Sequence, residues 1–403
     1  MRYLFLLLFV ALVPSVSAGD WPCWRGPHHD GIAQETVKSW PAAGPKVLWR
    51  ADLTGGYSSM VVASGRLFTQ TKDKQEDLVV CFDAVTGKRL WEHRYACDYA
   101  QYPSLDKRFL TGSKATPTVD GNYVYAIGNT GLLQCFDVKS GTLVWERDLL
   151  RLAGRSCPEY GYCNSPLIVG DLLFVHPGGS KNNSVAALDK HDGHVAWQAL
   201  DDRIGWATPV YIKVAGVPQV VYFTGQGGVG VSPADGKLLW RYDWKTAFDI
   251  NAATPIYSDG CLFLSSDYGN GGVLLRLKPA GDPEVVWKNK AMQNHFSTSV
   301  LYEGHLYGFS ADRLRCVEFK TGEVKWDKPG LGKGSLLVAG GQLIALGEHG
   351  ALVLAQATPK AYAEAARWQA LDGICWSVPV LANGTLYLRN EKQVLAVDLR
   401  DQR

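Results

Sequence analysis

The sequence predicts an all-β protein, an eight-bladed β-propeller whose blades are four-stranded antiparallel sheets. Short runs of apolar and β-branched residues alternate with Gly-containing turns along almost the whole chain. Tryptophan recurs at separations of about 40 to 55 residues, a period typical of propeller blades. The composition, with 43 Gly, 14 Trp and 18 Tyr in 403 residues, also favours many short strands over helices.

The clearest repeat unit is residues 116–149, which contains four apolar runs separated by Asp-Gly, Asn-Thr-Gly and Lys-Ser-Gly turns. In its last hairpin Asp137 precedes Gly141 by four residues and Trp145 by eight. Asp137 can accept hydrogen bonds from the turn, and Gly141 supplies the positive φ that the turn needs. Trp145 falls on the outermost strand, where its large side chain can pack against the neighbouring blade.

The same cassette recurs at Asp83-Gly87-Trp91, Asp189-Gly193-Trp197 and Glu318-Gly322-Trp326, and at Ser232-Gly236-Trp240 with Ser replacing the acid. It is degenerate before Trp287, where the chain has an insertion, and before Trp368, where the turn glycine is lost. One tryptophan marks the fourth strand of each unit: Trp49, Trp91, Trp145, Trp197, Trp240, Trp287, Trp326 and Trp368.

The two ends of the chain are predicted to share one blade. The last residues supply a second and a third strand and the marker Asp398, and the chain then stops before any tryptophan. Trp49 lies on an orphan fourth strand near the start. Pairing the two leaves no free sheet edge. Eight markers therefore predict eight blades, with seven as the competing count.

Residues 1–18 read as a secretory signal peptide cut after Ala18, because a basic start is followed by a short apolar run and small residues. An uncleaved membrane anchor is the alternative, although the run is shorter than the roughly 20 residues a spanning helix needs. Residues 19–45 are then an extended lead-in strapped to the surface by its aromatics, and residues 46–403 are a single propeller domain. In the lead-in, His28, His29 and Asp30 fit a solvated turn better than a metal site.

Nine cysteines fit an oxidising compartment, and the formal net charge of +2 with no basic stripe gives no reason to expect nucleic-acid binding. Cys81, Cys135 and Cys316 take the same place in their repeats and are expected to be small buried residues. We predict a disulfide between Cys157 and Cys163, which enclose a short loop. Pairing of Cys97 with either of these two is the rival.

A second register precedes each innermost strand, where small residues followed by Pro enter the axis of the propeller. Residues of this register and their neighbours should ring the mouth of the central channel. The candidates for a ligand funnel are Tyr57, Lys114, Tyr162, Trp206, Asn251, His295, Phe296, Lys333 and Trp376. Their aromatic faces suit stacking and their lysines an anionic group. The alternative is that the aromatics only plug the channel while the lysines reach water.

Two long connections between blades, residues 95–115 and 150–164, are expected to leave the sheets on this same face. Loops of such length are more often functional than idle.

The Asp-x3-Gly-x3-Trp repeat resembles that of the PQQ-binding-like propellers, and residues 21–31, WPCWRGPHHDG, resemble the lead-in of secreted bacterial members. The superfamily includes quinoprotein alcohol dehydrogenases and the lipoprotein propeller of the outer-membrane β-barrel assembly machine. The dipeptide Trp326-Asp327 does not indicate the WD40 family, because it marks only one blade. The resemblance implies the fold over nearly the whole chain, while function must come from a site.

In the quinoprotein dehydrogenases of this superfamily, the cofactor lies against a Trp, under a disulfide of adjacent cysteines and beside Ca²⁺. This sequence has no adjacent cysteines and no recognisable set of calcium ligands. The leading hypothesis is therefore an exported, non-catalytic binding or assembly scaffold without cofactor, metal or a transmembrane span after signal cleavage. Its partners would be proteins of the cell envelope or a small anionic or aromatic ligand. The alternative is a diverged PQQ-dependent or sugar-directed dehydrogenase, which would bind PQQ with Ca²⁺.

Overall fold

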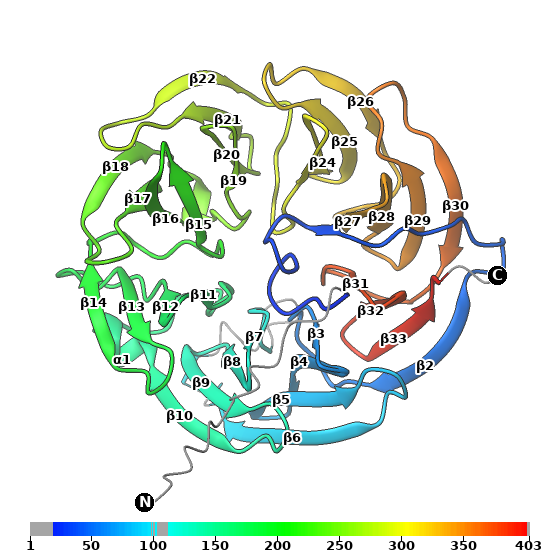
Figure 1. Ribbon diagram of the computed structural model, residues 1–403, viewed down its shortest axis with the longest axis horizontal. Coiled ribbons are helices and arrows are strands. Elements are labelled where there is room, and N and C mark those ends of the chain that lie inside the picture. The colour runs from blue at the N-terminus through cyan, green and yellow to red at the C-terminus, as the bar shows by residue number, and fades with distance from the viewer. Residues whose placement is uncertain (1–18, 98, 100, 103–111, 401–403) are drawn as a thin grey trace, which may run out of the picture.

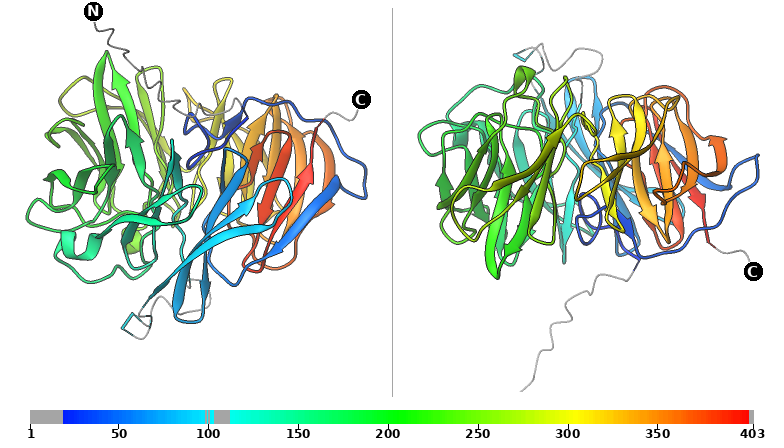
Figure 2. Two further views of the ribbon diagram at one scale, coloured as in Figure 1. Left: turned by 60° about the horizontal axis from the view of Figure 1, so that its bottom comes forward. Right: turned by 90° about the horizontal axis from the view of Figure 1, so that it is seen from above.

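A computed structural model describes residues 19–97, 99, 101–102 and 112–400, and the predicted signal peptide lies outside them. Eight sheets surround a central axis like the blades of a propeller (Figure 1). The predicted fold class and the predicted number of blades are both confirmed. The two side views show the sheets standing in one ring, with the turns between strands at the two ends (Figure 2).

Each complete blade is a meander of four consecutive antiparallel strands. Blade one contains β3 (Val61–Ala63), β4 (Arg66–Asp73), β5 (Glu76–Asp83) and β6 (Arg89–Ala96). Blade two contains β7 (Thr118–Asp120), β8 (Tyr123–Ile127), β9 (Leu132–Asp137) and β10 (Leu143–Asp148). Blade three contains β11 (Leu167–Val169), β12 (Leu172–Val175), β13 (Val185–Asp189) and β14 (Val195–Ala199).

Blades four to six follow the same order. Blade four contains β15 (Val210–Val214), β16 (Val217–Phe223), β17 (Gly227–Val231) and β18 (Leu238–Asp243). Blade five contains β19 (Ile256–Ser258), β20 (Cys261–Ser266), β21 (Gly271–Arg276) and β22 (Glu284–Asn289). Blade six contains β23 (Val300–Tyr302), β24 (His305–Ser310), β25 (Arg313–Glu318) and β26 (Val324–Lys328).

The last two blades also use strands from the start of the chain. Blade seven contains β27 (Ser335–Ala339), β28 (Gln342–Leu346), β29 (Ala351–Gln356) and β30 (Glu364–Gln369), with β1 (Ile32–Ala33) added in parallel to β27. Blade eight contains β31 (Val380–Ala382), β32 (Thr385–Arg389), β33 (Gln393–Asp398) and, as its outermost strand, β2 (Lys46–Asp52). The prediction that the two ends close one blade is confirmed.

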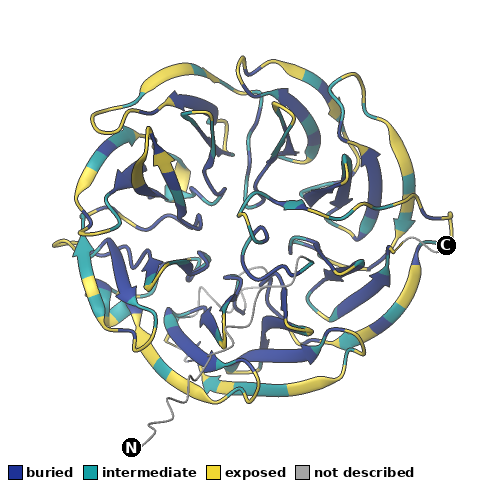
Figure 3. Cartoon of the chain, in the orientation of Figure 1, coloured by how far each residue is buried: buried dark blue, intermediate teal, exposed yellow. Residues whose placement is uncertain are grey.

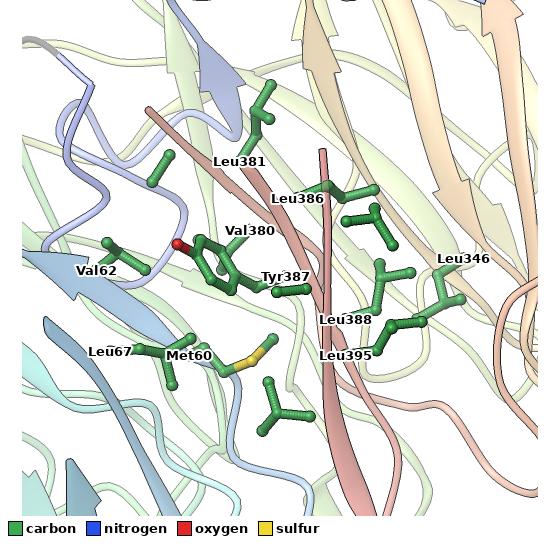
Figure 4. Close-up of a cluster of buried hydrophobic side chains, with 14 of the residues drawn as sticks. Met60, Val62, Leu67, Leu346, Val380, Leu381, Leu386, Tyr387, Leu388 and Leu395 are labelled. Carbon is green, nitrogen blue, oxygen red and sulfur yellow. The ribbon is translucent and has the colours of Figure 1, made fainter. Parts of the chain in front are cut away.

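The inner three strands of each blade are buried and the fourth is largely exposed (Figure 3). At the closure, side chains from blades seven, eight and one form a single apolar cluster (Figure 4). Met60, Leu67, Leu346, Leu388 and Leu395 belong to it, and none is more than 1% exposed. Burial of this cluster joins the two ends of the chain through the hydrophobic effect as well as through the β2–β33 ladder.

The marker tryptophans join neighbouring blades in a recurring way. The Trp91 indole N–H donates to the Val138 carbonyl of blade two, 3.1 Å away, and Trp145 donates to the Lys190 carbonyl of blade three, 3.0 Å away. A Cβ on Gly141, whose φ is +71°, would come within 2.5 Å of the Trp91 ring. The cassette glycine is thus required by the turn and also by the indole that covers it.

Two markers depart from this arrangement. The Trp240 N–H donates within its own blade to Gln219 Oε1 at 2.7 Å, and Gln219 Nε2 in turn reaches the Pro279 carbonyl of blade five at 3.1 Å. The ring of Trp368 covers Gly44, which precedes β2, and a Cβ on Gly44 would come within 2.4 Å of that ring. The split blade therefore has its cassette divided, with Asp398 from one end of the chain and Gly44 from the other.

The sequence predicts a lead-in strapped to the surface by its aromatics, whereas in the structure the lead-in enters the central channel. Trp21 bridges to Val62 beside β3, and its side chain is 2% exposed. Trp24 donates its indole N–H to Thr254 Oγ1 at 2.9 Å, across the channel. The segment runs through the middle of the ring before it follows blade seven outward (Figure 1). Trp21 is buried there and Trp24 is half-buried, so both lose apolar area that would be exposed to water on the outer surface.

Candidate functional site

A cavity of about 270 Å³ opens at the end of the channel where the blade-to-blade connectors lie. The antiparallel order of the strands places these connectors and the turn before each third strand on one face, and the cassette turns on the other. The cavity wall is strongly apolar and aromatic. Its aromatic side chains are Trp24, Tyr57, Tyr160, Trp206, Tyr268, His295, Phe296 and Trp376.

Six of the nine candidate funnel residues line this cavity. They are Tyr57, Lys114, Trp206, His295, Phe296 and Trp376. They come from five different connectors, since His295 and Phe296 are neighbours, and each connector enters the axis through the predicted register of small residues. Because the connectors converge on the axis, side chains that are far apart in the sequence form one wall.

The other three candidates are not part of the cavity lining. Tyr162 is fully buried and its hydroxyl donates to the Pro177 carbonyl at 3.0 Å. Asn251 is fully buried and its amide donates to the Thr224 carbonyl at 2.7 Å. The Lys333 backbone N–H donates to Glu348 Oε2 at 3.2 Å. The first two are structural, since each satisfies a backbone carbonyl that would otherwise be buried without a partner.

Three aromatic residues of the cavity were not among the candidates. Trp24 comes from the lead-in, Tyr160 lies within the second long connector, and Tyr268 lies in the turn between β20 and β21. None belongs to the repeating register. Tyr160 meets Trp206 edge-on with ring centroids 5.3 Å apart, an arrangement that aromatic quadrupoles favour.

A continuous path of aromatic rings runs from the protein surface into the cavity. Its successive members are Phe248, Tyr268, His295, Phe296, Trp376 and Tyr57, with centroid separations of 6.5, 5.3, 5.4, 5.1 and 5.2 Å. Phe248 is 69% exposed and Tyr268 is 46% exposed. The path thus begins in solvent and ends beside the axis.

The outer end of this path rests on strained backbone. Phe248 and Asp249 both have left-handed φ, +60° and +58°, which is uncommon for residues other than glycine. Asp249 accepts two hydrogen bonds from the Arg203 guanidinium, at 2.5 and 2.9 Å. Strain of this kind persists only where the surroundings hold it, and it is concentrated at functional sites.

Several polar groups at the rim are hydrogen-bonded to one another, whereas the buried Nδ1 of His295 has no partner among the described residues. Glu348 accepts from Trp376 Nε1 at 3.0 Å, and Tyr57 donates its hydroxyl to Glu391. The Nε2 of His295 lies 2.8 Å from the Tyr268 hydroxyl. Burial and, next, the Lys333 charge lower the pKa of His295 to about 4. His295 is therefore neutral at pH 7 and presents an uncharged ring to the cavity.

Among the described residues that line the cavity, Lys114 is the charged one. Its Nζ donates to Asn129 Oδ1 at 2.9 Å and to the Gly112 carbonyl at 3.3 Å. Burial is the main cause that lowers its pKa, and the nearby thiols and Asp77 oppose the shift. Asp77 is fully buried behind this wall, where it accepts hydrogen bonds from Tyr99 at 2.5 Å and from Ser113 and the Asn129 N–H at 3.2 Å.

The residues of this cavity do not fit the quinone of the superfamily. PQQ is a planar tricarboxylate, whereas the described residues of the wall offer one lysine that already donates to an amide and a carbonyl. Over the described part of the chain, no three His, Cys, Asp or Glu side chains are grouped so that they could hold a metal ion. His28, His29 and Asp30 lie at a second hollow, on the opposite face. No reaction step is therefore derived through PQQ.

The predicted disulfide between Cys157 and Cys163 is not formed in the structure, in which Cys97, Cys157 and Cys163 are all free thiols, the first buried and the other two half-buried. Cys163 Sγ is directed to the Tyr160 carbonyl at 3.6 Å, and Cys157 Sγ lies 4.0 Å from the Asn129 carbonyl. The two sulfurs therefore have different neighbours. Cys81, Cys135 and Cys316 are buried in the sheets, as predicted.

Fold and cavity together define an eight-bladed propeller with an aromatic funnel on its connector face. The sequence matches the family described as outer membrane protein assembly factor BamB over residues 33–101 and 75–328. The chain belongs to this family, which confirms the resemblance seen in the repeat. None of the helices in the described residues is both long and apolar enough to cross a membrane.

Individual relatives show how far the similarity extends. Outer membrane protein assembly factor BamB of Yersinia pestis is 23% identical over 231 residues, which are 54% of this chain and 56% of that protein. The chain spans about half the length of the curated relatives that it matches. Their partners and activities are therefore matters for proposal.

Solved structures support the fold. BamB from Moraxella catarrhalis superposes with a TM-score of 0.63 at 14% identity and covers 88% of this chain and 100% of its own. Quinohemoprotein alcohol dehydrogenase from Comamonas testosteroni gives 0.64 at 12% identity, over 94% of this chain and 80% of its own. A BamB protein and an alcohol dehydrogenase match about equally well, so the likeness shows the architecture and leaves function to the site.

Proposed function

We propose that the protein is exported and acts without catalysis, as a binding and assembly scaffold that holds a protein of the cell envelope on its connector face. The observation that carries this proposal is the path of aromatic rings from Phe248 into the cavity. Rigid aromatic side chains offer large contact areas at small entropic cost and dominate the energetics of protein interfaces.

Family membership and the signal-like features of the N-terminus support the same function. The relatives are named as outer membrane protein assembly factors, and residues 1–18 have the features of a cleavable signal peptide. The cavity volume of about 270 Å³ exceeds the roughly 150 Å³ of an apolar cavity that takes up benzene. It has room for a large side chain of a partner, with further contacts on the exposed rim at Phe248 and Tyr268.

Site-specific crosslinking in cells tests the proposal. A photoreactive phenylalanine analogue at position 248 should give adducts with envelope proteins, because this side chain is exposed at the mouth of the funnel. The matched control is the same analogue at Val85, which is 76% exposed in a cassette turn on the opposite face. Adducts that are absent at position 248, or equal at both positions, contradict the proposal.

The dehydrogenase alternative has its own assay. Purified protein is incubated with PQQ and Ca²⁺, and dye reduction is followed with a panel of alcohols and aldoses. We expect neither bound cofactor absorbance nor turnover, because Lys114 is the one cationic side chain among the described residues of the wall, too few for three carboxylates. Stoichiometric cofactor binding with turnover refutes the scaffold proposal in favour of the enzyme.

A further inference from the structure

Two thiols from different connectors lie against one turn, although about 60 residues separate them in the chain. Cys97 Sγ is 3.8 Å from Thr130 Oγ1, and Cys157 Sγ is 4.0 Å from the carbonyl of the preceding residue, Asn129. Cys97 and Tyr99 form a small apolar cluster against which Cys157 packs. The fold thus brings together two cysteines that the sequence places at opposite ends of blade two.

Cys163 lies in a different environment from this pair. It packs in the cluster that includes Trp206 and lines the cavity, with Sγ directed to the Tyr160 carbonyl. Burial raises the pKa of Cys157 to about 12, and the next contribution is the charge of Cys97, ahead of that of Cys163. Cys157 thus packs against Cys97 and Tyr99, whereas Cys163 packs in a different cluster, so packing favours Cys97 as the partner of Cys157.

We propose that Cys97 and Cys157 form a disulfide bond that ties the two long connectors together behind the cavity wall. The connectors carry Lys114 and Tyr160, which both line the cavity. A covalent tie between them holds this side of the funnel in one shape, whatever ligand the funnel takes. The inference uses only the export part of the proposed function, since the bond needs an oxidising compartment.

The bond forms by exchange with a small disulfide or the disulfide of an oxidoreductase. The Cys157 thiolate attacks that disulfide and releases one thiol, and the Cys97 thiolate then displaces the second. Two protein thiols and one oxidant disulfide become one protein disulfide and two oxidant thiols. Burial raises the pKa of both cysteines to about 12, so few thiolates exist once the connectors are packed. The exchange therefore belongs to folding.

Disulfide mapping of refolded protein tests the pairing. The full mature chain is refolded with oxidised and reduced glutathione, alkylated, and digested with trypsin and then chymotrypsin. The second enzyme cuts after Tyr160 and so separates Cys157 from Cys163. We expect a linked pair of peptides that contain Cys97 and Cys157. A link between Cys157 and Cys163, or no link at all, overturns the proposal.

Single substitutions supply the matched controls. Cys163→Ser should keep the bond, and its melting temperature should fall on addition of reductant as that of the wild type does. Cys97→Ser and Cys157→Ser should lose the bond, and reductant should no longer change their melting temperatures. Equal responses in all three variants refute the pairing. Because the mapping uses purified protein, its outcome is separate from that of the crosslinking experiment.

Discussion

The contact between the cassette glycine and the tryptophan of the preceding blade makes a sharp prediction for Gly141→Ala. The left-handed φ of +71° costs an alanine about 1 to 2 kcal/mol. The new Cβ would lie 2.5 Å from Trp91 Cδ2 and 2.7 Å from Cε3. Trp91 cannot move away freely, because its ring also contacts Phe68 and Phe136 with centroids 5.8 and 6.2 Å away.

Forcing extra volume against a packed ring costs a further 1 to 3 kcal/mol or so. The total loss for Gly141→Ala is then about 2 to 5 kcal/mol in the free energy of unfolding. Urea unfolding followed by tryptophan fluorescence measures this loss. The matched control is Gly121→Ala in the same blade, where φ is +56° and a Cβ meets no atom within 4 Å. It should lose only the backbone strain, about 1 to 2 kcal/mol.

A double-mutant cycle isolates the indole contact. In a Trp91→Ala background, Gly141→Ala should cost no more than Gly121→Ala does, because the ring that clashes is gone. If Gly141→Ala and Gly121→Ala destabilise the wild-type chain equally, the reasoning is refuted. The glycine would then serve the turn alone, and the blade contact would not explain the repeat.

Two further predictions concern buried polar groups. Arg389 is fully buried and donates to Thr69 Oγ1 and to the carbonyls of Gly55, Gly56 and Gln70. Arg389→Leu should therefore lower the free energy of unfolding in urea by about 3 to 5 kcal/mol. The control Arg400→Leu, at an exposed site of the same blade, should lower it by less than about 1 kcal/mol. His176 is neutral because burial lowers its pKa to about 4, below the roughly 6.5 of the unfolded chain, so the unfolded state takes up the proton first. The free energy of unfolding should therefore fall by about 3 kcal/mol between pH 6.5 and pH 4. His176→Leu should remove this part of the dependence of stability on pH.

The fold could be predicted from the sequence because each residue of the repeat has a local structural role. The turn acid, the positive-φ glycine and the blade-bridging tryptophan recur together, and each has the role that its chemistry implies. Asp137 Oδ1 accepts from the backbone N–H groups of Lys139 and Ser140, at 3.0 and 2.8 Å. The same reasoning missed Gly44, since its cassette is divided between the two ends of the chain and no local spacing can reveal it.

The residues of the site could be predicted only where they belong to the repeating register that precedes the innermost strands. Register placed Trp206, Phe296 and Trp376 at the mouth of the channel, because every connector enters the axis in the same way. Register does not fix the direction of a neighbouring side chain, so Tyr162 and Asn251 turned out to satisfy backbone carbonyls instead. For the disulfide, proximity in the chain favoured Cys163 over Cys97 as the partner of Cys157, whereas packing in the fold favours Cys97.

The lead-in explains why the funnel is open on one face. Trp24 reaches the cavity from the opposite end of the channel and is held there by its hydrogen bond to Thr254. Its neighbours Trp21 and Arg25 are 2% and 5% exposed, so the segment is packed in the channel as a plug. A ligand that enters the cavity beside Phe248 would meet Trp24 inside it. Such a cavity suits a protruding side chain of a docked partner better than a molecule that passes along the axis.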